Sequence, residues 1–317
     1  MLKDQLGILI KETLDNLVPD GASYVLTDLP YHLNIGDLLI WEGTRQYFNY
    51  RKDMKCLGLS SSFTFNFPDL SEDTIIFLNG GGSFGDLWAG SQQFRLKLVA
   101  HYKNNKIIIL PQSIHYTDNL LMLSDFNQFN KYKNTYFCFR DLPSFNLALR
   151  HLNSSRVFLV PDMALLIDTS AYVTKKKVIS NELLYIKRED KEWTNKNILL
   201  PRDKIKIKDW PSFNSKNPNI LLFRLLLRLN HMCLDKGFND MAPILDIYCN
   251  KVLRPTLIKM GVNFISNYDT VITSRLHGLI LSFLLDRKIF FVDNLTQKLS
   301  AFVDTWLTDC KNIKKLG

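Results

Sequence analysis

Short apolar segments alternate with amphipathic ones along nearly the whole chain, and this alternation constrains the fold more than any other feature. Clear apolar segments are "TIIFL" at 74–78, "KIIIL" at 106–110 and "TVITS" at 270–274. Segments with helical spacing of their apolar residues lie between such stretches. Strands that are apolar on both faces and separated by helices are typical of a parallel sheet covered on both sides. We therefore expect an α/β protein with doubly wound parallel sheets.

The length of 317 residues indicates two domains, since a domain usually has about 100–200 residues. The strand–helix pattern restarts at "ELLYIKRED", after a lysine-rich passage. We predict Rossmann-like domains at 1–172 and 173–317. The last helix, at about 298–307, could instead pack back on the first domain.

The chain is basic, with 40 lysines and arginines against 31 acidic residues, which gives a net charge of +9. Such an excess fits a solvated basic surface, or attraction to phosphate ligands, lipid headgroups or nucleic acid. Lysines cluster in "YVTKKKV" and "RDKIKIKDW". No nucleic-acid-binding motif accompanies them, so nucleic acid is disfavoured as a partner.

Cysteine usage and hydropathy indicate a cytoplasmic protein. The five cysteines form no CxxC pair and no zinc-type spacing with histidine, and no HExxH or DxD motif is present, so we expect neither disulfides nor a metal. No signal peptide and no apolar window of about 18 uncharged residues is found. At most peripheral contact with the inner face of the membrane is expected. The segment "LLFRLLLRL" could be an interfacial basic helix, but a packed domain helix with arginines at its edge fits better.

A glycine-rich stretch, "NGGGSFGD" at 79–86, follows one predicted strand and precedes a predicted helix. Gly80, Gly82 and Gly85 match G-x-G-x-x-G. A dinucleotide site also needs an acidic residue at the end of the next strand, which here ends in Pro-Gln-Ser at 111–113. Two interpretations therefore remain: a tight turn that needs positive φ angles, or a loop that lets a ligand approach the backbone and a helix N-terminus.

Two further junctions carry polar residues. Asn34, Gly36 and Asp37 lie in the turn before a predicted helix, where they could cap free amide groups or contact a ligand. Arg140 ends the strand in "FCFRDLPS", where it could form an exposed ion pair with Asp141 or bind an anion. Pro143 suits the first turn of the helix that follows.

The most informative junction is "TSRLHGLI", where Arg275 and His277 come between a strand and a buried helix. A guanidinium can hold a carboxylate or phosphate with two parallel hydrogen bonds, and a helix N-terminus adds free amides. An imidazole beside them can transfer a proton near neutral pH. The alternative is a histidine bonded to the backbone and an arginine in an ion pair, but this spacing favours a functional site.

Seven stretches together resemble the polysaccharide pyruvyl transferase family. They are, in chain order, "NIGDLLIWEG", "LNGGGSFGDLW", "ILPQSI", "FRDLPS", "VPDMAL", "SRLHGLI" and "KLSAFVDTWL". The resemblance extends from about residue 30 to residue 308 and is loose over about 172–240.

The resemblance implies a GT-B-like fold, with two Rossmann-type domains facing an interdomain cleft. It also implies transfer of pyruvate from phosphoenolpyruvate to a hexose residue of a cell-surface polysaccharide precursor, which forms a cyclic ketal. The family's R-L-H motif, which helps bind phosphoenolpyruvate and supplies the essential histidine, maps to Arg275, Leu276 and His277. The family's arginine before an acidic residue maps to Arg140.

The resemblance extends the predicted site. Further family motifs map to Asn34, Gly36, Asp37, Gly80, Gly81, Gly82 and Asp86. Because phosphoenolpyruvate carries a carboxylate and a phosphate, we expect additional cationic donors at Lys187 and Arg188. We further expect His277 to act as the acid, and Asp37 or Asp86 to accept hydroxyl protons. The partners would be phosphoenolpyruvate and a hexose-containing acceptor, free or lipid-linked, with no cofactor.

Two rival functions stay open. A glycosyltransferase of the same architecture would use a sugar nucleotide and needs an acidic residue for the ribose in the second domain, where Glu189 or Asp190 are candidates. A non-catalytic sugar- or lipid-surface-binding relative would keep the fold without turnover.

Overall fold

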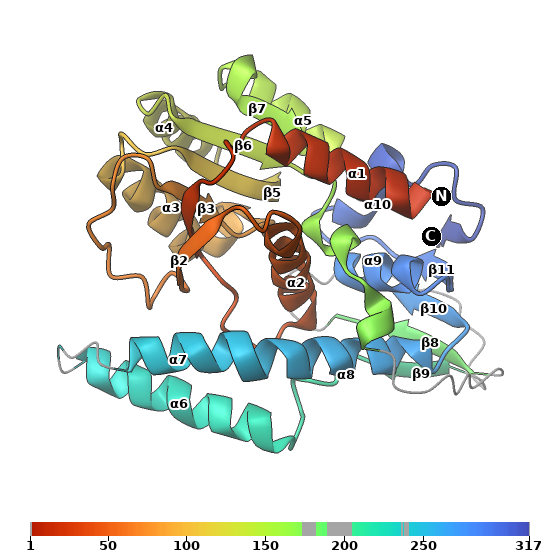
Figure 1. Cartoon of the computed structure of the whole chain (residues 1–317). Coiled ribbons are helices and arrows are strands. Elements are labelled where there is room, and N and C mark those ends of the chain that lie inside the picture. Colours follow the sequence, from red (N-terminus) through yellow and green to blue (C-terminus); the bar gives the residue numbers. More distant parts are fainter. Residues whose placement is uncertain (1, 173–181, 189–204, 236, 238–240, 317) are drawn as a thin grey trace. The chain divides into compact units, whose positions relative to one another are not determined.

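The computed structural model describes residues 2–172, 182–188, 205–235, 237 and 241–316 (Figure 1). The chain forms two compact units, one of Met1–Pro30 with Gly43–Leu166 and one of Tyr31–Glu42 with Ile167–Gly317. These are called unit 1 and unit 2 below. The predicted domain division at residues 172 and 173 stays a prediction, because compactness alone does not establish an independent domain.

Unit 1 contains, among the described residues, a seven-stranded sheet in which every pairing is parallel. The strand order is β2-β1-β3-β5-β6-β7, and β4 pairs with β5. The strands are β1 Ser23–Thr27, β2 Lys55–Leu59, β3 Ile75–Leu78, β4 Gly81–Gly85, β5 Ile107–His115, β6 Thr135–Phe139 and β7 Val157–Leu159. All four residues of β3 are buried, as expected for a strand covered on both faces.

The first helix of unit 1 precedes its strands, and the others follow strands. The helices are α1 Leu2–Asp15, α3 Ala89–His101, α4 Asn119–Asn130, α5 Leu142–Leu149 and the second half of α2 Ile35–Tyr50. Helix α5 begins as predicted, with Pro143 in its first turn and the Asp141 carboxylate accepting a hydrogen bond of 2.9 Å from the Ser144 amide.

Unit 2 contains a second parallel sheet in the part of the chain that the structure describes. Its order is β12-β11-β10-β8-β9. The strands are β8 Leu183–Ile186, β9 Ile205–Lys208, β10 Thr270–Thr273, β11 Lys288–Phe291 and β12 Ile313–Lys315. From β8 the chain adds β9 on one side and then β10 on the other. In doubly wound sheets, ligands bind beyond the carboxyl ends of strands at such a switch point.

Two helices of unit 2 are separated by a break next to Pro255. The helices of this unit are α6 Pro218–Asp235, α7 Ala242–Tyr248, α8 Arg254–Ser266, α9 Leu276–Leu284 and α10 Lys298–Trp306, which contacts α9. A π-helical turn, Cys249–Leu253, separates α7 from α8, and Pro255 lies in the first turn of α8. The proline has no amide N–H and cannot continue a regular helix through this point.

The prediction of an α/β protein with parallel sheets is confirmed. Strands β9 and β12 were not predicted, because "IKIK" and "IKK" carry lysines and are largely exposed at the two edges of their sheet. Lys175, Lys176 and Lys177 of the other lysine cluster, and also Glu189 and Asp190, lie outside the described residues. No described helix has both the length and the apolar character that crossing a bilayer requires.

Two helical glycines test the packing of unit 1. A Cβ added to Gly43 in α2 would lie 1.8 Å from the backbone oxygen of Met163, whereas one added to Gly90 in α3 would meet nothing within 4 Å. We expect Gly43→Ala to lower the free energy of unfolding by about 1–3 kcal/mol or more, since the backbones must move apart. Gly90→Ala should raise it by about 0.5–1 kcal/mol. Urea denaturation measures both changes, and equal effects would contradict this packing.

Candidate active site

The carboxyl ends of β8 and β10 bring two predicted site residues together in unit 2. Ile186 is paired with Thr273 in the parallel ladder, so the residues that follow each strand continue side by side. The Ser274 amide donates to the Ile186 oxygen at 3.0 Å, and the Arg188 amide donates to Ser274 Oγ at 3.0 Å. Arg188 and Arg275 therefore follow neighbouring strand ends at the switch point of this sheet.

The Arg275 guanidinium is held in a fixed orientation by an acidic residue. Its Nε and Nη2 atoms donate to Asp209 Oδ1 and Oδ2, both at 2.5 Å, and it lies over the Phe213 ring with 5.5 Å to the centroid. The ion-pair interpretation of Arg275 is thus confirmed. These bonds use two of the five N–H donors of the guanidinium.

Asp209 is a site residue that the sequence analysis missed. It directly follows β9, which neighbours β8, so it lies at the same edge of the sheet as Arg188 and Arg275. Recognition of "IKIK" as a strand would have indicated it. Farther along this segment, Ser212 Oγ donates to the Leu33 oxygen at 2.5 Å, which links the segment to the residues before α2.

His277 packs directly against the first turn of α2. The imidazole belongs to the second residue of α9 and is 8% exposed. A Cβ added to Gly36 would lie 2.8 Å from His277 Nδ1 and 3.0 Å from His277 Cβ. A side chain at residue 36 would require the imidazole to move, so the two motifs "NIGD" and "RLHG", far apart in the sequence, are in contact within unit 2.

The turn before α2 is capped by its own polar residues. Asn34 Oδ1 accepts from the Gly36 amide at 3.2 Å, and Asn34 Nδ2 donates to Asp37 Oδ2 at 2.7 Å. His32 Nε2 lies 3.5 Å from the same Asp37 oxygen. The capping interpretation of Asn34 is therefore confirmed, while ligand contacts of Asn34 and Asp37 stay predictions.

The remaining residues predicted in this part of the sequence have local contacts in the structure, and their substrate contacts stay predictions. Leu276 is buried in the packing around α9, and the Lys187 amide donates to the Lys208 oxygen at 3.0 Å. Gly278 is the third residue of α9. A Cβ there would lie 2.5 Å from Thr273 Oγ1, so what approaches Gly278 is the preceding strand.

The glycine-rich stretch of unit 1 is a strand, β4, rather than a loop before a helix. Gly81 and Gly85 have φ angles of 150° and 120°, and a Cβ on Gly85 would lie 1.9 Å from the His115 oxygen in β5. Between them Phe84 is 1% exposed and packs against Phe139 and other core phenylalanines, which draws the segment into the sheet.

A helical segment follows this stretch, and the approach of a ligand to its N-terminus stays a prediction. A 3-10 turn of Asp86–Trp88 comes after β4, and α3 begins only at Ala89. The positive-φ interpretation of the glycines is confirmed at Gly81 and Gly85. Gly80 is buried and Gly82 is half-buried, and their predicted substrate contacts stay predictions.

A fully buried arginine that the sequence analysis missed fixes this strand. Arg95 Nη1 donates to the Ser83 oxygen at 2.8 Å and to Gln92 Oε1 at 3.2 Å, and Arg95 Nη2 lies 3.1 Å from Asp28 Oδ2. Gln92 Oε1 also accepts from the Gly85 amide. Burial lowers the pKa of Arg95 while the Asp28 carboxylate opposes the shift.

Asp86 closes the turn before α4. Its Oδ2 atom accepts from the Thr117 amide at 2.6 Å, from Thr117 Oγ1 at 2.7 Å and from the Asp118 amide at 2.9 Å. Burial favours a higher pKa for the Asp86 carboxyl, but these hydrogen bonds and the nearby His115 outweigh it, and the pKa is lowered. The proton-accepting role of Asp86 stays a prediction.

Arg140 is buried in unit 1, and the expected exposed pair with Asp141 is wrong. Its Nη1 lies 2.6 Å from Asp162 Oδ2 and its Nε donates to Ser113 Oγ at 2.9 Å. Asp141 instead accepts from Ser113 Oγ at 2.6 Å while it caps α5. The acidic residue of "VPDMAL" is thus the partner that neutralises this arginine.

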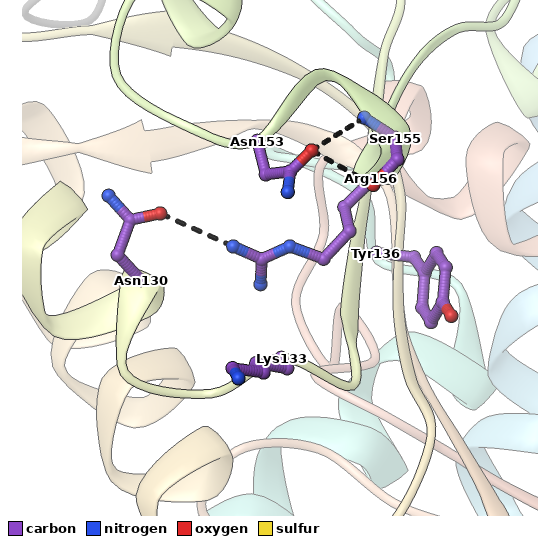
Figure 2. Close-up of a pocket in the computed structure, with 6 residues that line it drawn as sticks. All are labelled: Asn130, Lys133, Tyr136, Asn153, Ser155 and Arg156. Carbon is purple, nitrogen blue, oxygen red and sulfur yellow. Dashed lines mark hydrogen bonds between the residues drawn. The ribbon is translucent and has the colours of Figure 1, made fainter.

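An open hollow in unit 1 lies away from these residues (Figure 2). Its lining includes Tyr136 at the start of β6 and Arg156 just before β7, so it faces the amino ends of the strands, whereas Arg140 follows the carboxyl end of β6. Arg156 Nη2 donates to Asn130 Oδ1 at 3.2 Å across it. Among the described residues, no group of three or more histidines, cysteines and acidic residues could hold a metal ion.

Comparison with known proteins agrees with the resemblance carried by the motifs. Residues 34–295 match the model of the family described as polysaccharide pyruvyl transferase. The "Putative pyruvyl transferase EpsO" of Bacillus subtilis (strain 168) is 32% identical over 95% of this chain and 91% of its own length. "Pyruvyl transferase 1" of Schizosaccharomyces pombe is 22% identical over 90% of this chain and 70% of its own. A functionally uncharacterized protein of Klebsiella pneumoniae, of known crystal structure, has the same fold, with a TM-score of 0.69, 18% identity and 98% coverage of each chain.

The contact between Gly36 and His277 can be tested without substrate. A methyl group at residue 36 must displace the imidazole, so we expect Gly36→Ala to shift the His277 ring signals in proton–nitrogen correlation spectra. Gly90→Ala, whose new methyl group meets open space, is the control. The signals of His101 and His151, which belong to unit 1, should stay in place in both variants. Unchanged His277 signals in Gly36→Ala would contradict the contact.

Proposed function

Because the chain belongs to the polysaccharide pyruvyl transferase family, we propose that it transfers pyruvate from phosphoenolpyruvate to a hexose residue of a cell-surface polysaccharide precursor, forming a cyclic ketal. The observation that carries this proposal is the position of Arg275 and His277 beyond the carboxyl end of β10, beside the end of β8. This is where a doubly wound sheet binds its ligand.

The donor-binding part of the proposal rests on the cationic and amide groups around the start of α9. Phosphoenolpyruvate carries a carboxylate and a phosphate, and Arg275 and Arg188 offer guanidinium groups at neighbouring strand ends. The first turn of α9 adds amide groups and the positive end of a helix dipole. Asp209 would keep Arg275 oriented before the donor arrives, so that less rotamer freedom is lost on binding.

In the proposed reaction, His277 donates a proton to the methylene carbon of phosphoenolpyruvate, which becomes the methyl group of the ketal. Positive charge then develops at the neighbouring carbon, and one sugar hydroxyl attacks this carbon. A second hydroxyl of the same hexose then attacks this carbon, and phosphate leaves. Asp37, half-buried in the first turn of α2, is the proposed acceptor of a hydroxyl proton near His277, and Asp86 is the corresponding candidate in unit 1.

The proposal also covers the arrangement of the units, the acceptor and the location. We propose a GT-B-like arrangement in which the two units face a cleft. The acceptor would be free or lipid-linked, and the reaction would take place at the cytoplasmic side of the membrane. A donor contact by Arg140 requires an N–H group beyond those bonded to Asp162 and Ser113. Glycine backbone in β4 would contact the acceptor.

His277→Ala tests the proton donor. We expect phosphate release from phosphoenolpyruvate, measured with acceptors ending in galactose, glucose or N-acetylmannosamine, to fall by about 100-fold or more, since positioned acid–base groups contribute about 10²–10⁴-fold. His231→Ala, on the exposed part of α6, is the matched control and should keep full activity. Circular dichroism and melting temperature establish that both variants fold. Retention of His277→Ala activity within about threefold of the wild type would remove His277 from the mechanism.

Arg275→Lys tests the proposed binding of phosphoenolpyruvate by Arg275. A lysine cannot make two parallel bonds to Asp209 or to a donor oxygen pair, so we expect the KM for phosphoenolpyruvate to rise about tenfold, equivalent to about 1.4 kcal/mol, while kcat changes less. Arg150→Lys, at an exposed helix end, is the control. Thermal-shift measurements should also show stabilisation by phosphoenolpyruvate. Stabilisation by UDP- or GDP-sugars instead, with an unchanged KM in Arg275→Lys, would favour a sugar-nucleotide glycosyltransferase.

A further inference from the structure

Helix α6 exposes large apolar side chains along one side. Its buried residues include Ile220, Phe223 and Asn230, which face the rest of unit 2. The other side carries five exposed apolar residues, each between 38% and 56% exposed: Leu221, Leu222, Leu225, Leu229 and Met232. Their spacing of three or four residues places them in one stripe. A domain helix normally turns its apolar stripe inward, and α6 has apolar residues both inward and outward.

The exposed apolar surface continues on the neighbouring helix. Helices α6 and α7 lie side by side in unit 2, and Tyr248 Oη donates to the Asn219 oxygen at 2.8 Å between them (Figure 1). Ile244 and Ile247 of α7 are 51% and 59% exposed. Single exposed apolar residues are common, but a group on two adjacent helices indicates a binding surface.

The charges in α6 and just before it are all positive up to Asp235, the exposed last residue of the helix. No aspartate or glutamate occurs from residue 210 to residue 234, whereas Lys216, Arg224 and Arg228 lie in this segment. Lys216 and Arg228 are exposed, and Arg224 is half-buried, with Nη2 donating to the Phe213 oxygen at 2.9 Å. The helix therefore combines exposed leucines, whose transfer out of water is favourable, with cationic side chains. No acidic residue occurs in the helix before Asp235.

This charge decides between two kinds of occupant. In a two-fold symmetric contact with a second copy, the same surface meets itself, and the arginines of one copy would lie near the arginines of the other. An anionic lipid surface instead offers negative headgroups to the arginines and lysine and an apolar layer to the leucines. Long basic side chains can keep their charge at the headgroup level while their stems lie on apolar surface.

We propose that α6, with the adjoining side of α7, docks the protein on an anionic lipid bilayer, with the helix lying in the plane of the interface. Its 18 residues extend about 27 Å, at about 1.5 Å per residue. The helix would lie in the interface rather than cross the bilayer, so the proposed attachment is peripheral. The docking surface is separate from the residues proposed for catalysis and does not depend on the proposed reaction.

The test is flotation of the full chain with lipid vesicles. We expect binding to vesicles of phosphatidylglycerol and phosphatidylcholine, little binding to phosphatidylcholine alone, and weaker binding at high salt, because the charge attraction is screened. Replacing Leu225 and Leu229 by Gln should lower the bound fraction at least about fivefold, since these two large apolar side chains no longer insert into the bilayer. The matched control replaces the exposed Leu120 and Leu123 of α4 by Gln and should bind like the wild type.

Three outcomes would overturn the proposal. One is the absence of wild-type binding to the anionic vesicles. Another is an equal loss of binding in the α4 control, which would indicate a general effect of surface apolarity. The third is a dimer in sedimentation that dissociates in the Leu225/Leu229 variant without any vesicle binding, which would assign the surface to a second copy. Melting temperatures within a few degrees establish that the exposed substitutions leave the fold intact.

Discussion

The candidate site depends on the parallel pairing of β8 with β10. Because both strands run in the same direction and are in register at Ile186 and Thr273, the residues that leave them emerge at one edge of the sheet. Arg188 and Arg275 become neighbours for this reason alone, although the segments between them include three α-helices and strand β9. Strand β9 adds Asp209 at the same edge. A slip of the ladder by one residue would turn every side chain of the shifted strand to the other face.

Three of the buried arginines in the described part of the chain are paired with an acidic residue. Arg140 pairs with Asp162, Arg95 with Asp28 and Arg254 with Glu42. Leaving a buried charge without its partner is strongly destabilising, by about 3–5 kcal/mol when one partner is removed. The pairs therefore impose specific geometry on the junctions where they occur. Arg95 fixes the backbone of β4, while Arg140 donates to Ser113 Oγ, which in turn donates to Asp141, the residue that caps α5.

Sequence patterns predicted the fold class well and the contacts of the site only partly. Uninterrupted apolar runs such as that of β3 identified the buried strands, and the strand-to-helix junction identified Arg275 and His277. Patterns of one segment could not show which distant segment it would meet. Asp209 was missed because it follows a lysine-rich edge strand with little apolar signal. The glycines of β4 were predicted to form a loop because the burial of Phe84 depends on packing with phenylalanines that are distant in the sequence. The contact of Gly36 with His277 likewise requires tertiary structure.

The first half of α2 has a consequence for how the chain can be divided. Residues 31–42 belong to unit 2 although the chain on both sides of them belongs to unit 1. Ile35 is fully buried and presses on Gly261, and Trp41 lies under the Arg254 guanidinium, whose partner is Glu42. A fragment that begins after residue 166 would keep every strand of the second sheet and lose these side chains, leaving Arg254 without its carboxylate and α8 with an exposed groove in place of Ile35. Truncation at any single peptide bond therefore cannot release unit 2 intact.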